Sequence, residues 1–236
     1  MRLSLAMICR DEERTIKPCL ESCIDIVDEV ILVDTGSKDK TLDVAQEVCG
    51  DKLRIATKEW TNDFSAPRNL SFTLASGDFI LWLDCDDTLA NPAALRKFIE
   101  DNQDTVDVVH LMYDYAKDEF GNLAVVHWRD RVIRNLRNPD GSCAFQWNDR
   151  IHEYMRYPEG TRVSGFNESK VIHNRDSSAG NRPSHRNLEI LKEVIKDSGG
   201  LDKASPRHLV YLGNEYWTLD EMDKGQEAFE AYHFLS

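Results

Sequence analysis

The sequence lacks any long apolar run, and this absence excludes a transmembrane helix. A helix that crosses a bilayer needs about 20 consecutive apolar residues, and no apolar stretch of the 236-residue chain approaches that length. The first stretch, Leu3–Cys9, is shorter than a signal-peptide core and lacks a small-residue cleavage site. We therefore interpret it as a first strand and expect a soluble, cytoplasmic protein, for which peripheral contact with a membrane stays open.

Cysteine is sparse, and no two cysteines form a C-x-x-C pair. In a chain without a secretion signal, scattered cysteines are more often reduced and buried than joined in disulfides or bound to zinc. We expect free thiols at all six positions, which are Cys9, Cys19, Cys23, Cys49, Cys85 and Cys143.

Basic residues are also in short supply. The chain has 29 lysines and arginines against 42 aspartates and glutamates, which gives a formal net charge of −13. This charge repels polyanions, so nucleic acid is disfavoured as a partner. At roughly 100–200 residues per domain, the length predicts one main domain with a small C-terminal addition.

Short apolar runs alternate with segments of helical period over the first third of the chain. This rhythm predicts βαβ units and a mainly parallel sheet, hence an α/β fold. The expected strands and helices, in chain order, are Leu3–Cys9, Thr15–Ile26, Glu29–Val33, Thr41–Val48, Leu53–Thr57, Ser65–Ala75 and Phe79–Leu83. Ligand sites of such sheets lie beyond the carboxyl ends of the strands, so we expect the polar loops 34–39 and 84–87 to face one crevice.

The remaining chain divides into a hairpin region and a helical tail. Two strand-like stretches, Val106–Tyr115 and Ala124–Asn135, are separated by a turn and predict a β-hairpin. From Pro183 onward helical spacing dominates. We therefore predict a main domain over residues 1–182 and C-terminal helices over residues 183–236.

The loop after Phe79–Leu83 carries three carboxylates in four residues, Asp84, Asp86 and Asp87. Such a group is costly to hold together unless a cation neutralises it, and hard carboxylate oxygens suit Mg²⁺ or Mn²⁺. At a strand end this pattern predicts a metal–phosphate site. The simpler interpretation is a solvated acidic turn that caps the following helix.

Four motifs around this loop resemble those of the family-two glycosyltransferases, which have the GT-A fold, a Rossmann-like nucleotide-binding sheet with helices on both faces. The resemblance spans nearly all of residues 2–197. The motifs are Cys9–Glu13, Asp28–Thr41, Phe64–Asn69 and Asp84–Asp87. The first departs from the family pattern because Arg10 and Asp11 replace lysine and asparagine, and the third departs at Pro67.

The resemblance implies a role for each matched residue. Asp34 would contact the nucleoside, Arg68 would face the nucleotide, and Asp84 would meet the ribose. Asp86, together with Asp87, would hold the metal that bridges the two phosphates. The complete set expected to bind the nucleotide sugar is Cys9, Arg10, Glu12, Asp34, Arg68, Asp84, Cys85 and Asp86.

Two later motifs resemble a subgroup of that family that carries tetratricopeptide repeats. Trp147–Glu153 looks like its histidine–glutamate motif and suggests Glu153 as the catalytic base, with Asp149 in reserve. Val171–His173 matches its later histidine, which implies that His173 is a metal ligand. The tyrosine–glycine that usually follows is replaced by Asn174 and Arg175.

The tail itself resembles one tetratricopeptide helix pair, through Leu209–Tyr216 and Ala228-Phe229. A departure is Gly225, where that repeat prefers alanine. A lone pair cannot bury its own apolar face. We therefore expect the tail to dock on the main domain or to mediate self-association as a homo-oligomer, unless the chain is a fragment of a longer protein.

Each assignment has a structural alternative. Asp34 could form a turn with Gly36, and His152 or His173 could be hydrogen-bonded structural residues. Glu153 could pair with Arg150 or Arg156.

The rival functions come from two other classes. The acidic loop also fits haloacid-dehalogenase-type phosphatases, with Asp84 as nucleophile and Asp86 as acid/base, but that motif usually lies on a first strand. A non-catalytic interaction scaffold is the second rival.

Together these inferences predict a metal-dependent glycosyltransferase that uses Mn²⁺ or Mg²⁺ and a nucleotide-sugar donor. A UDP-sugar is expected, with UDP-glucose and UDP-N-acetylglucosamine leading. The resemblance implies inversion at the anomeric carbon. The acceptor stays open among a peptide, a glycan and a lipid-linked sugar.

Overall fold

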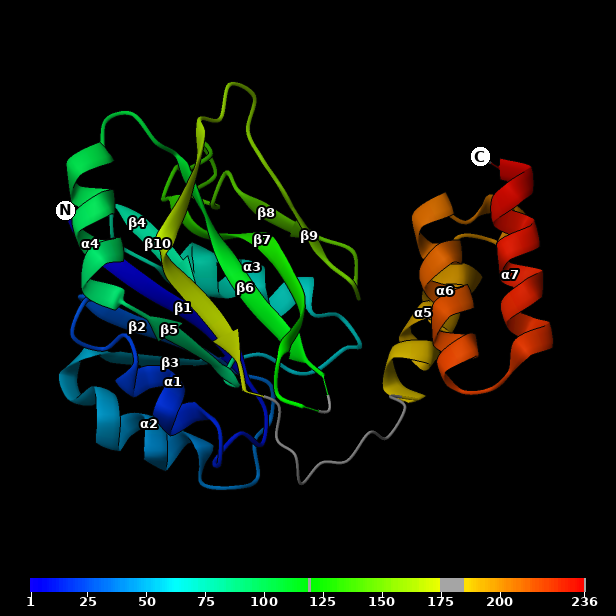
Figure 1. Ribbon diagram of the computed structural model, residues 1–236, viewed down its shortest axis with the longest axis horizontal. Coiled ribbons are helices and arrows are strands. Elements are labelled where there is room, and N and C mark those ends of the chain that lie inside the picture. The colour runs from blue at the N-terminus through cyan, green and yellow to red at the C-terminus, as the bar shows by residue number, and fades with distance from the viewer. Residues whose placement is uncertain (119, 175–184, 236) are drawn as a thin grey trace. The chain divides into compact units, whose positions relative to one another are not determined.

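The structure is a computed structural model that describes residues 1–118, 120–174 and 185–235. Its residues form two compact units (Figure 1). The sheet unit comprises Met1–Trp60, Ala66–Trp147 and the chain from Met155 to the end of the last strand. The helical unit comprises Thr61–Ser65, Asn148–Tyr154 and the C-terminal helices.

A mixed eight-stranded sheet organises the sheet unit, in the order β3-β2-β1-β4-β7-β6-β10-β5. The strands are β1 (Leu3–Cys9), β2 (Glu29–Asp34), β3 (Leu53–Thr57), β4 (Phe79–Trp82), β5 (Asp87–Ala90), β6 (Val108–Lys117), β7 (Leu123–Arg134) and β10 (Val163–His173). The first four are parallel neighbours, and β6 and β10 are also parallel. A separate two-stranded sheet pairs β8 (Gln146–Asn148) with β9 (Tyr154–Arg156).

Helices cover both faces of this sheet. One face packs against α1 (Ile16–Glu21), α2 (Thr41–Cys49) and α4 (Pro92–Asn102), and the other packs against α3 (Ser65–Leu74). Because both faces are covered, β2 and β4 are buried along their whole length and read as continuous apolar runs instead of alternating ones. The α/β class predicted from the sequence is confirmed.

The expected mainly parallel sheet was an incomplete description. The predicted hairpin is present as β6 and β7, but it joins the main sheet, with β7 antiparallel to β4. Asp87, expected as the last residue of the acidic loop, begins β5 (Asp87–Ala90), which pairs with β10. The first helix ends at Glu21, five residues early, and the next hydroxyl, that of Ser22, bonds back to the carbonyl of Cys19.

The helical unit contains α5 (His185–Asp197), α6 (Pro206–Thr218) and α7 (Met222–Leu235). Helices α6 and α7 pack closely through glycine. A Cβ atom on Gly225 would lie 2.4 Å from the Trp217 ring, and one on Gly213 would lie 2.6 Å from the Phe229 ring. The Trp217 ring therefore leaves no room for a Cβ atom at Gly225.

The predicted boundary after residue 182 lies outside the described residues. The loop Asn148–Tyr154 groups with the C-terminal helices although it precedes that boundary. All six cysteines are buried free thiols, as predicted.

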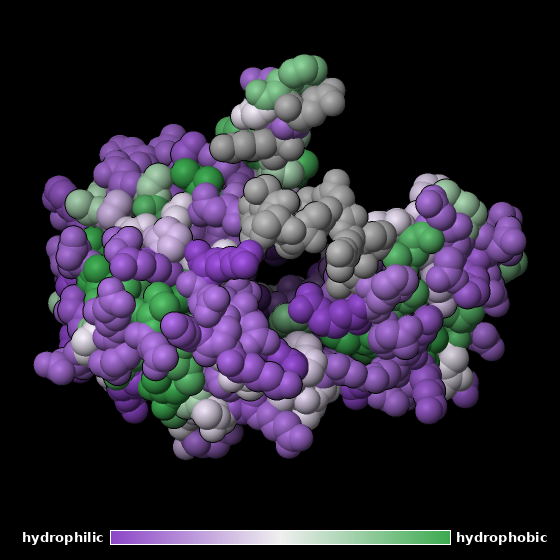
Figure 2. Space-filling view, turned by 90° about the horizontal axis from the view of Figure 1, so that it is seen from below, coloured by the Kyte–Doolittle hydropathy of each residue, from purple (hydrophilic) through white to green (hydrophobic). Residues whose placement is uncertain are grey.

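None of the helices in the described part of the chain combines the length and the apolar composition that a membrane span requires. The face shown in Figure 2 is mainly hydrophilic, with apolar residues in small separate patches, as expected for a chain with 30% charged residues.

Candidate active site at the carboxyl edge of the sheet

The carboxyl ends of β1, β2 and β4 lie at one edge of the sheet. Cys9 at the end of β1 pairs with Asp34 at the end of β2, and Ala6 pairs with Trp82 at the end of β4. The loops 34–39 and 84–87 therefore leave the sheet at the same edge, as predicted.

The acidic loop is a tight turn between β4 and β5. The backbone N–H of Asp87 donates to the carbonyl of Asp84 at 3.0 Å, and the N–H of Asp84 donates to the Asp87 carboxylate at 3.3 Å. Side chains alternate along it. Those of Asp84 and Asp86 are 32% and 34% exposed, whereas Cys85 and Asp87 point inward. The loop thus presents two carboxylates outward and keeps a third inside.

The buried carboxylate of Asp87 is held from three sides. The guanidinium of Arg131 lies 2.9 Å from Oδ2, while the hydroxyl of Tyr113 donates to Oδ1 at 2.9 Å. His173 Nδ1 lies 3.4 Å from Oδ1 of Asp87 and 3.6 Å from Oδ2 of Asp86. Ligand atoms of Asp86, Asp87 and His173 lie within 4.8 Å of one another. This donor set of one imidazole and two carboxylates could hold a divalent cation.

Arg131 was missed by the sequence analysis. Its side chain is 1% exposed, and its guanidinium lies 4.1 Å from the ring centroid of Trp82 and 4.4 Å from that of Tyr113. A buried arginine in a strand marks a fixed charge, but the sequence around it contains Arg129 and Arg134 as well. Only the fold distinguishes the arginine that reaches Asp87.

The charges at this edge perturb one another. Burial, followed by the nearby Asp84 and Asp87, raises the pKa of Asp86 to about 6, although His173 opposes the shift. Burial and the charge of Asp84 also raise the pKa of Glu12. The hydrogen bond to Asp87 raises the pKa of His173. Among residues 1–118, 120–174 and 185–235, the acids at this edge thus disfavour one another's ionised forms, which favours binding of an external cation.

Comparison with known proteins agrees with this geometry. The model of the family described as "Glycosyl transferase family 2" matches residues 4–178 of the chain. The chain belongs to glycosyltransferase family 2. The phosphatase alternative is not favoured by this match.

Relatives of this family 2 chain include the glycosyltransferase SunS of Bacillus subtilis strain 168. The two are 26% identical over 250 residues, which cover 97% of this chain and 51% of SunS. A TPR repeat-containing protein of Synechococcus elongatus is 48% identical over 88 residues, 37% of this chain and 21% of that protein. The chain thus spans about half or less of these relatives.

Among solved structures, S. aureus TarS 1-349 is similar to the chain, with a TM-score of 0.57 and 15% identity. The alignment covers 98% of this chain and 80% of TarS 1-349. This likeness confirms the GT-A fold expected from the sequence.

The segment that begins at Asp34 forms a turn. The Asp34 carboxylate accepts hydrogen bonds from the backbone N–H groups of Gly36, at 3.2 Å, and Ser37, at 3.0 Å. The thiol of Cys9 lies 3.6 Å from the same carboxylate, and burial, together with the Asp34 charge, raises the Cys9 pKa to about 12. Asp34 is thus a turn former at the correct edge, and its contact with a nucleoside stays a prediction.

Arg68 connects the family 2 helix motif to the acidic loop. Its guanidinium lies 2.7 Å from Asp84 Oδ1 and 5.2 Å from the ring centroids of both Trp82 and Trp147. Burial alone would raise the pKa of Asp84, but Arg68 and then Arg131 lower it overall. Asp84 therefore stays ionised in this pair.

Three further residues of the predicted set have distinct positions. Arg10 is exposed, whereas Glu12 is partly buried and accepts a hydrogen bond from the hydroxyl of Thr15. The Cys85 thiol faces the core and donates to the carbonyl of Ile8 at 3.3 Å. Any ligand contact of Cys85 would therefore come from its backbone.

The predicted catalytic residues Asp149 and Glu153 belong to the helical unit. Asp149 lies 3.5 Å from the guanidinium of Arg207 and 3.3 Å from the imidazole of His208. Next to Glu153, the ring of His152 stacks on Tyr211 with centroids 3.9 Å apart and an interplanar angle of 9°. Helix α6 thus fixes the loop that carries both candidates.

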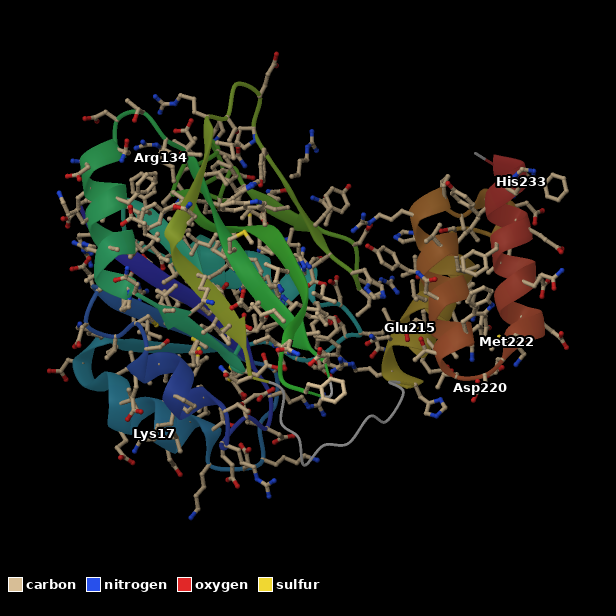
Figure 3. The ribbon with its side chains drawn as sticks, in the orientation of Figure 1. Lys17, Arg134, Glu215, Asp220, Met222 and His233 are labelled. Atoms are coloured by element: carbon tan, nitrogen blue, oxygen red, sulfur yellow. The ribbon has the colours of Figure 1, made fainter. Side chains whose placement is uncertain are left out.

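This loop has an uncommon backbone. Asp149 has φ of +70° and His152 has φ of +52°, in the left-handed region that non-glycine residues rarely adopt. Glu215 of α6, labelled in Figure 3, lies 3.4 Å from the His152 imidazole. These contacts match the structural interpretation of His152.

Proposed function

We propose that this chain transfers a sugar from a nucleotide-sugar donor, a UDP-sugar, to an acceptor nucleophile with the help of a divalent cation. The observation that carries the proposal is the cluster of Asp86, Asp87 and His173 at the carboxyl edge of a family 2 sheet. Structures titled as TarS 1-349 complexes with UDP and with UDP-GlcNAc share this fold, with TM-scores of 0.56 and 0.50. They support a uridine nucleotide as the donor group.

The residues present fit Mn²⁺ or Mg²⁺, because two carboxylates and an imidazole meet at an edge where acids have raised pKa values. When bound, the cation would neutralise the charge that develops on the leaving diphosphate. Asp86, Asp87 and His173 are the proposed ligands. Arg131 and Tyr113, on the two oxygens of Asp87, would hold that carboxylate in place.

The remaining residues would bind and orient the donor. Asp34 would contact the nucleoside, and the pair of Arg68 and Asp84 would lie on the nucleotide side. The other proposed contacts come from the end of β1 and the loop after it, through Cys9, Arg10 and Glu12, and from the acidic loop, through Cys85.

We propose inversion through a single displacement, with Glu153 as the base that deprotonates the acceptor. Asp149 is disfavoured because Arg207 and His208 already flank its carboxylate. NMR of the product's anomeric signal tests the proposal, and a retained configuration would contradict it. The acceptor class stays open among a peptide, a glycan and a lipid-linked sugar.

Calorimetric titration with UDP, with and without Mn²⁺, separates the three candidate functions. A transferase binds UDP in a metal-dependent way. A phosphatase would instead release phosphate from a phosphomonoester, and a scaffold would do neither. If the folded chain bound no UDP either with or without Mn²⁺, the proposed function would be overturned.

Self-association through the C-terminal helices stays a prediction. Trp217, Met222 and Phe234 are 54%, 52% and 84% exposed, and they line a groove of about 620 Å³. Figure 3 shows Met222 and His233, which both line this groove, at opposite ends of α7. Light scattering of the full chain tests this prediction, because a monomeric mass at micromolar concentration would exclude it.

A further inference from the structure

The end of β6 carries an aromatic side chain that the proposed function does not use. Tyr115 is 47% exposed although its neighbour Tyr113 is buried. In the pairing of β6 with β7, Asp114 faces Val126 and Ala116 faces Val125, so Tyr115 is the extra residue of a β-bulge. Bulges re-aim side chains and are common beside active sites.

The bulge places Tyr115 against the metal cluster. Ile172 of β10 pairs with Asp114 of β6, so the next residues, His173 and Tyr115, are neighbours at the carboxyl edge. Their rings stack with centroids 5.4 Å apart and an interplanar angle of 17°. The ring centroid of His127, on β7, lies 5.7 Å from that of Tyr115. One face of the Tyr115 ring thus covers the imidazole of His173, and nearly half of the side chain remains accessible.

We propose that Tyr115 is a binding surface for a pyranose ring. The C–H groups of a pyranose form an apolar face that packs on an aromatic ring, whereas its hydroxyls stay with water or polar groups. The inference rests on the proposed function, because a cation held by Asp86, Asp87 and His173 would bind the diphosphate of the donor and bring its sugar near a ring stacked on His173.

The alternative is that Tyr115 only covers His173. The covering role and the sugar-binding role predict different effects of a substitution at Tyr115. Loss of a cover would alter the affinity for Mn²⁺ and for UDP, which has no pyranose. Loss of a sugar surface would leave both unchanged and would weaken ligands that carry the ring.

The first experiment titrates Tyr115→Ala, Tyr115→Leu and Tyr115→Phe with UDP, UDP-glucose and UDP-N-acetylglucosamine in Mn²⁺. We expect UDP affinity within about 2-fold of the parent for all three, and about 10-fold weaker UDP-sugar binding for Ala and Leu but not for Phe. Leucine separates a requirement for the ring from a requirement for apolar bulk. Trp128→Ala is the matched control, since Trp128 is 48% exposed on the same hairpin but points to the opposite face.

The second experiment follows the binding of methyl glucoside and methyl N-acetylglucosaminide by saturation-transfer NMR, with and without UDP and Mn²⁺. Loss of this signal in Tyr115→Ala, at an unchanged ratio of UDP-sugar to UDP affinity, assigns the surface to the acceptor sugar. A changed ratio assigns it to the transferred sugar. Unchanged results in both experiments, or equal losses for UDP and UDP-sugars, would overturn the proposal.

The two experiments also separate this inference from the proposed function. A parent chain that binds no UDP in Mn²⁺ would overturn the proposed donor. A Tyr115-dependent glycoside signal in that same chain would still establish the sugar surface.

Discussion

Buried acids at the amino edge and at the carboxyl edge of the main sheet differ in how they are paired with basic side chains. At the amino edge, Asp107 is bound by both Arg134 and Arg162 at 2.8 Å. Figure 3 labels Arg134 in the sheet unit. At the carboxyl edge, Arg68 pairs with Asp84 and Arg131 pairs with Asp87, while burial raises the pKa of the nearby acids Glu12 and Asp86.

The pKa values record this difference. Hydrogen bonds from Arg162 hold the pKa of Asp107 well below its usual range, whereas burial raises the pKa of Asp86 to about 6. The amino edge is therefore satisfied by the chain itself and contributes stability. In the described part of the chain, the carboxyl edge has acids with raised pKa values, and such perturbed groups are common where a site binds a ligand.

The largest effect on stability is expected for Arg131→Met, which leaves the buried Asp87 without its cation. Breaking a buried pair costs about 3–5 kcal/mol. Denaturant unfolding in EDTA would measure the loss. Adding Asp87→Asn should recover part of it, and a double variant less stable than Arg131→Met would contradict the pairing.

The next effect is expected for Asp86→Asn, which removes charge from the carboxyl edge. Mn²⁺-dependent UDP binding should weaken by about 100-fold, since even loss of an outer partner of a ligand costs 10–100-fold. Without metal the variant should be more stable at pH 7 by on the order of 1 kcal/mol, after allowance for solvent screening.

The sign follows from the raised pKa of Asp86. The folded state binds the proton more tightly, so the penalty of ionisation appears as pH rises from about 4 to about 6. The stability difference between parent and Asp86→Asn should therefore vanish below pH 4. A metal-free variant less stable than the parent at pH 7 would contradict the comparison of the edges.

At the opposite edge, Asp107→Asn should destabilise the fold by about 2 kcal/mol and leave UDP binding unchanged in the folded protein. Because the folded pKa of Asp107 is depressed, its contribution is complete above the unfolded pKa near 3.9 and is lost as pH falls below it. Thermal unfolding at pH 7 and at pH 3 should show the variant converging on the parent in acid.

The smallest effect on metal-free stability is expected for His173→Ala. The pKa of His173 is raised, so its contribution is complete below the unfolded pKa near 6.5 and is lost as pH rises through the folded value. In EDTA the loss should be on the order of 1 kcal/mol at pH 6 and smaller at pH 9. A large loss at both pH values would favour a purely structural histidine, whereas weaker Mn²⁺ affinity would support the ligand role.

Much of the parallel half of the sheet could be predicted, because strands buried on both faces appear as uninterrupted apolar runs. Leu3–Cys9 is such a strand and has the predicted bounds. Leu53–Thr57 also has the predicted bounds, although it contains Arg54 and is partly exposed. Strand β5 could not be predicted in this way, since its four residues begin with the aspartate of the acidic turn and their partner is about 80 residues away in β10.

The candidate site shows the same limit. Asp86 and His173 were predicted from motifs, and the structure brings them together, but the roles of Arg131 and Tyr115 depend on long-range pairing and on a bulge. A single arginine or tyrosine in a strand gives no local signal of what it will meet. The motifs predicted which residues lie at the carboxyl edge, whereas the contacts of Arg131 and Tyr115 could be identified only from the three-dimensional structure.

The loop Asn148–Tyr154 has a consequence for the order in which the chain acquires its structure. The guanidinium of Arg207 donates to the carbonyl of His152 across 55 residues, and Tyr211 stacks on the same histidine. Synthesis at roughly 5–20 residues per second delays these partners by about 3–11 seconds after the loop leaves the ribosome. The nascent loop therefore lacks its contacts with α6 until Pro206–Thr218 have emerged.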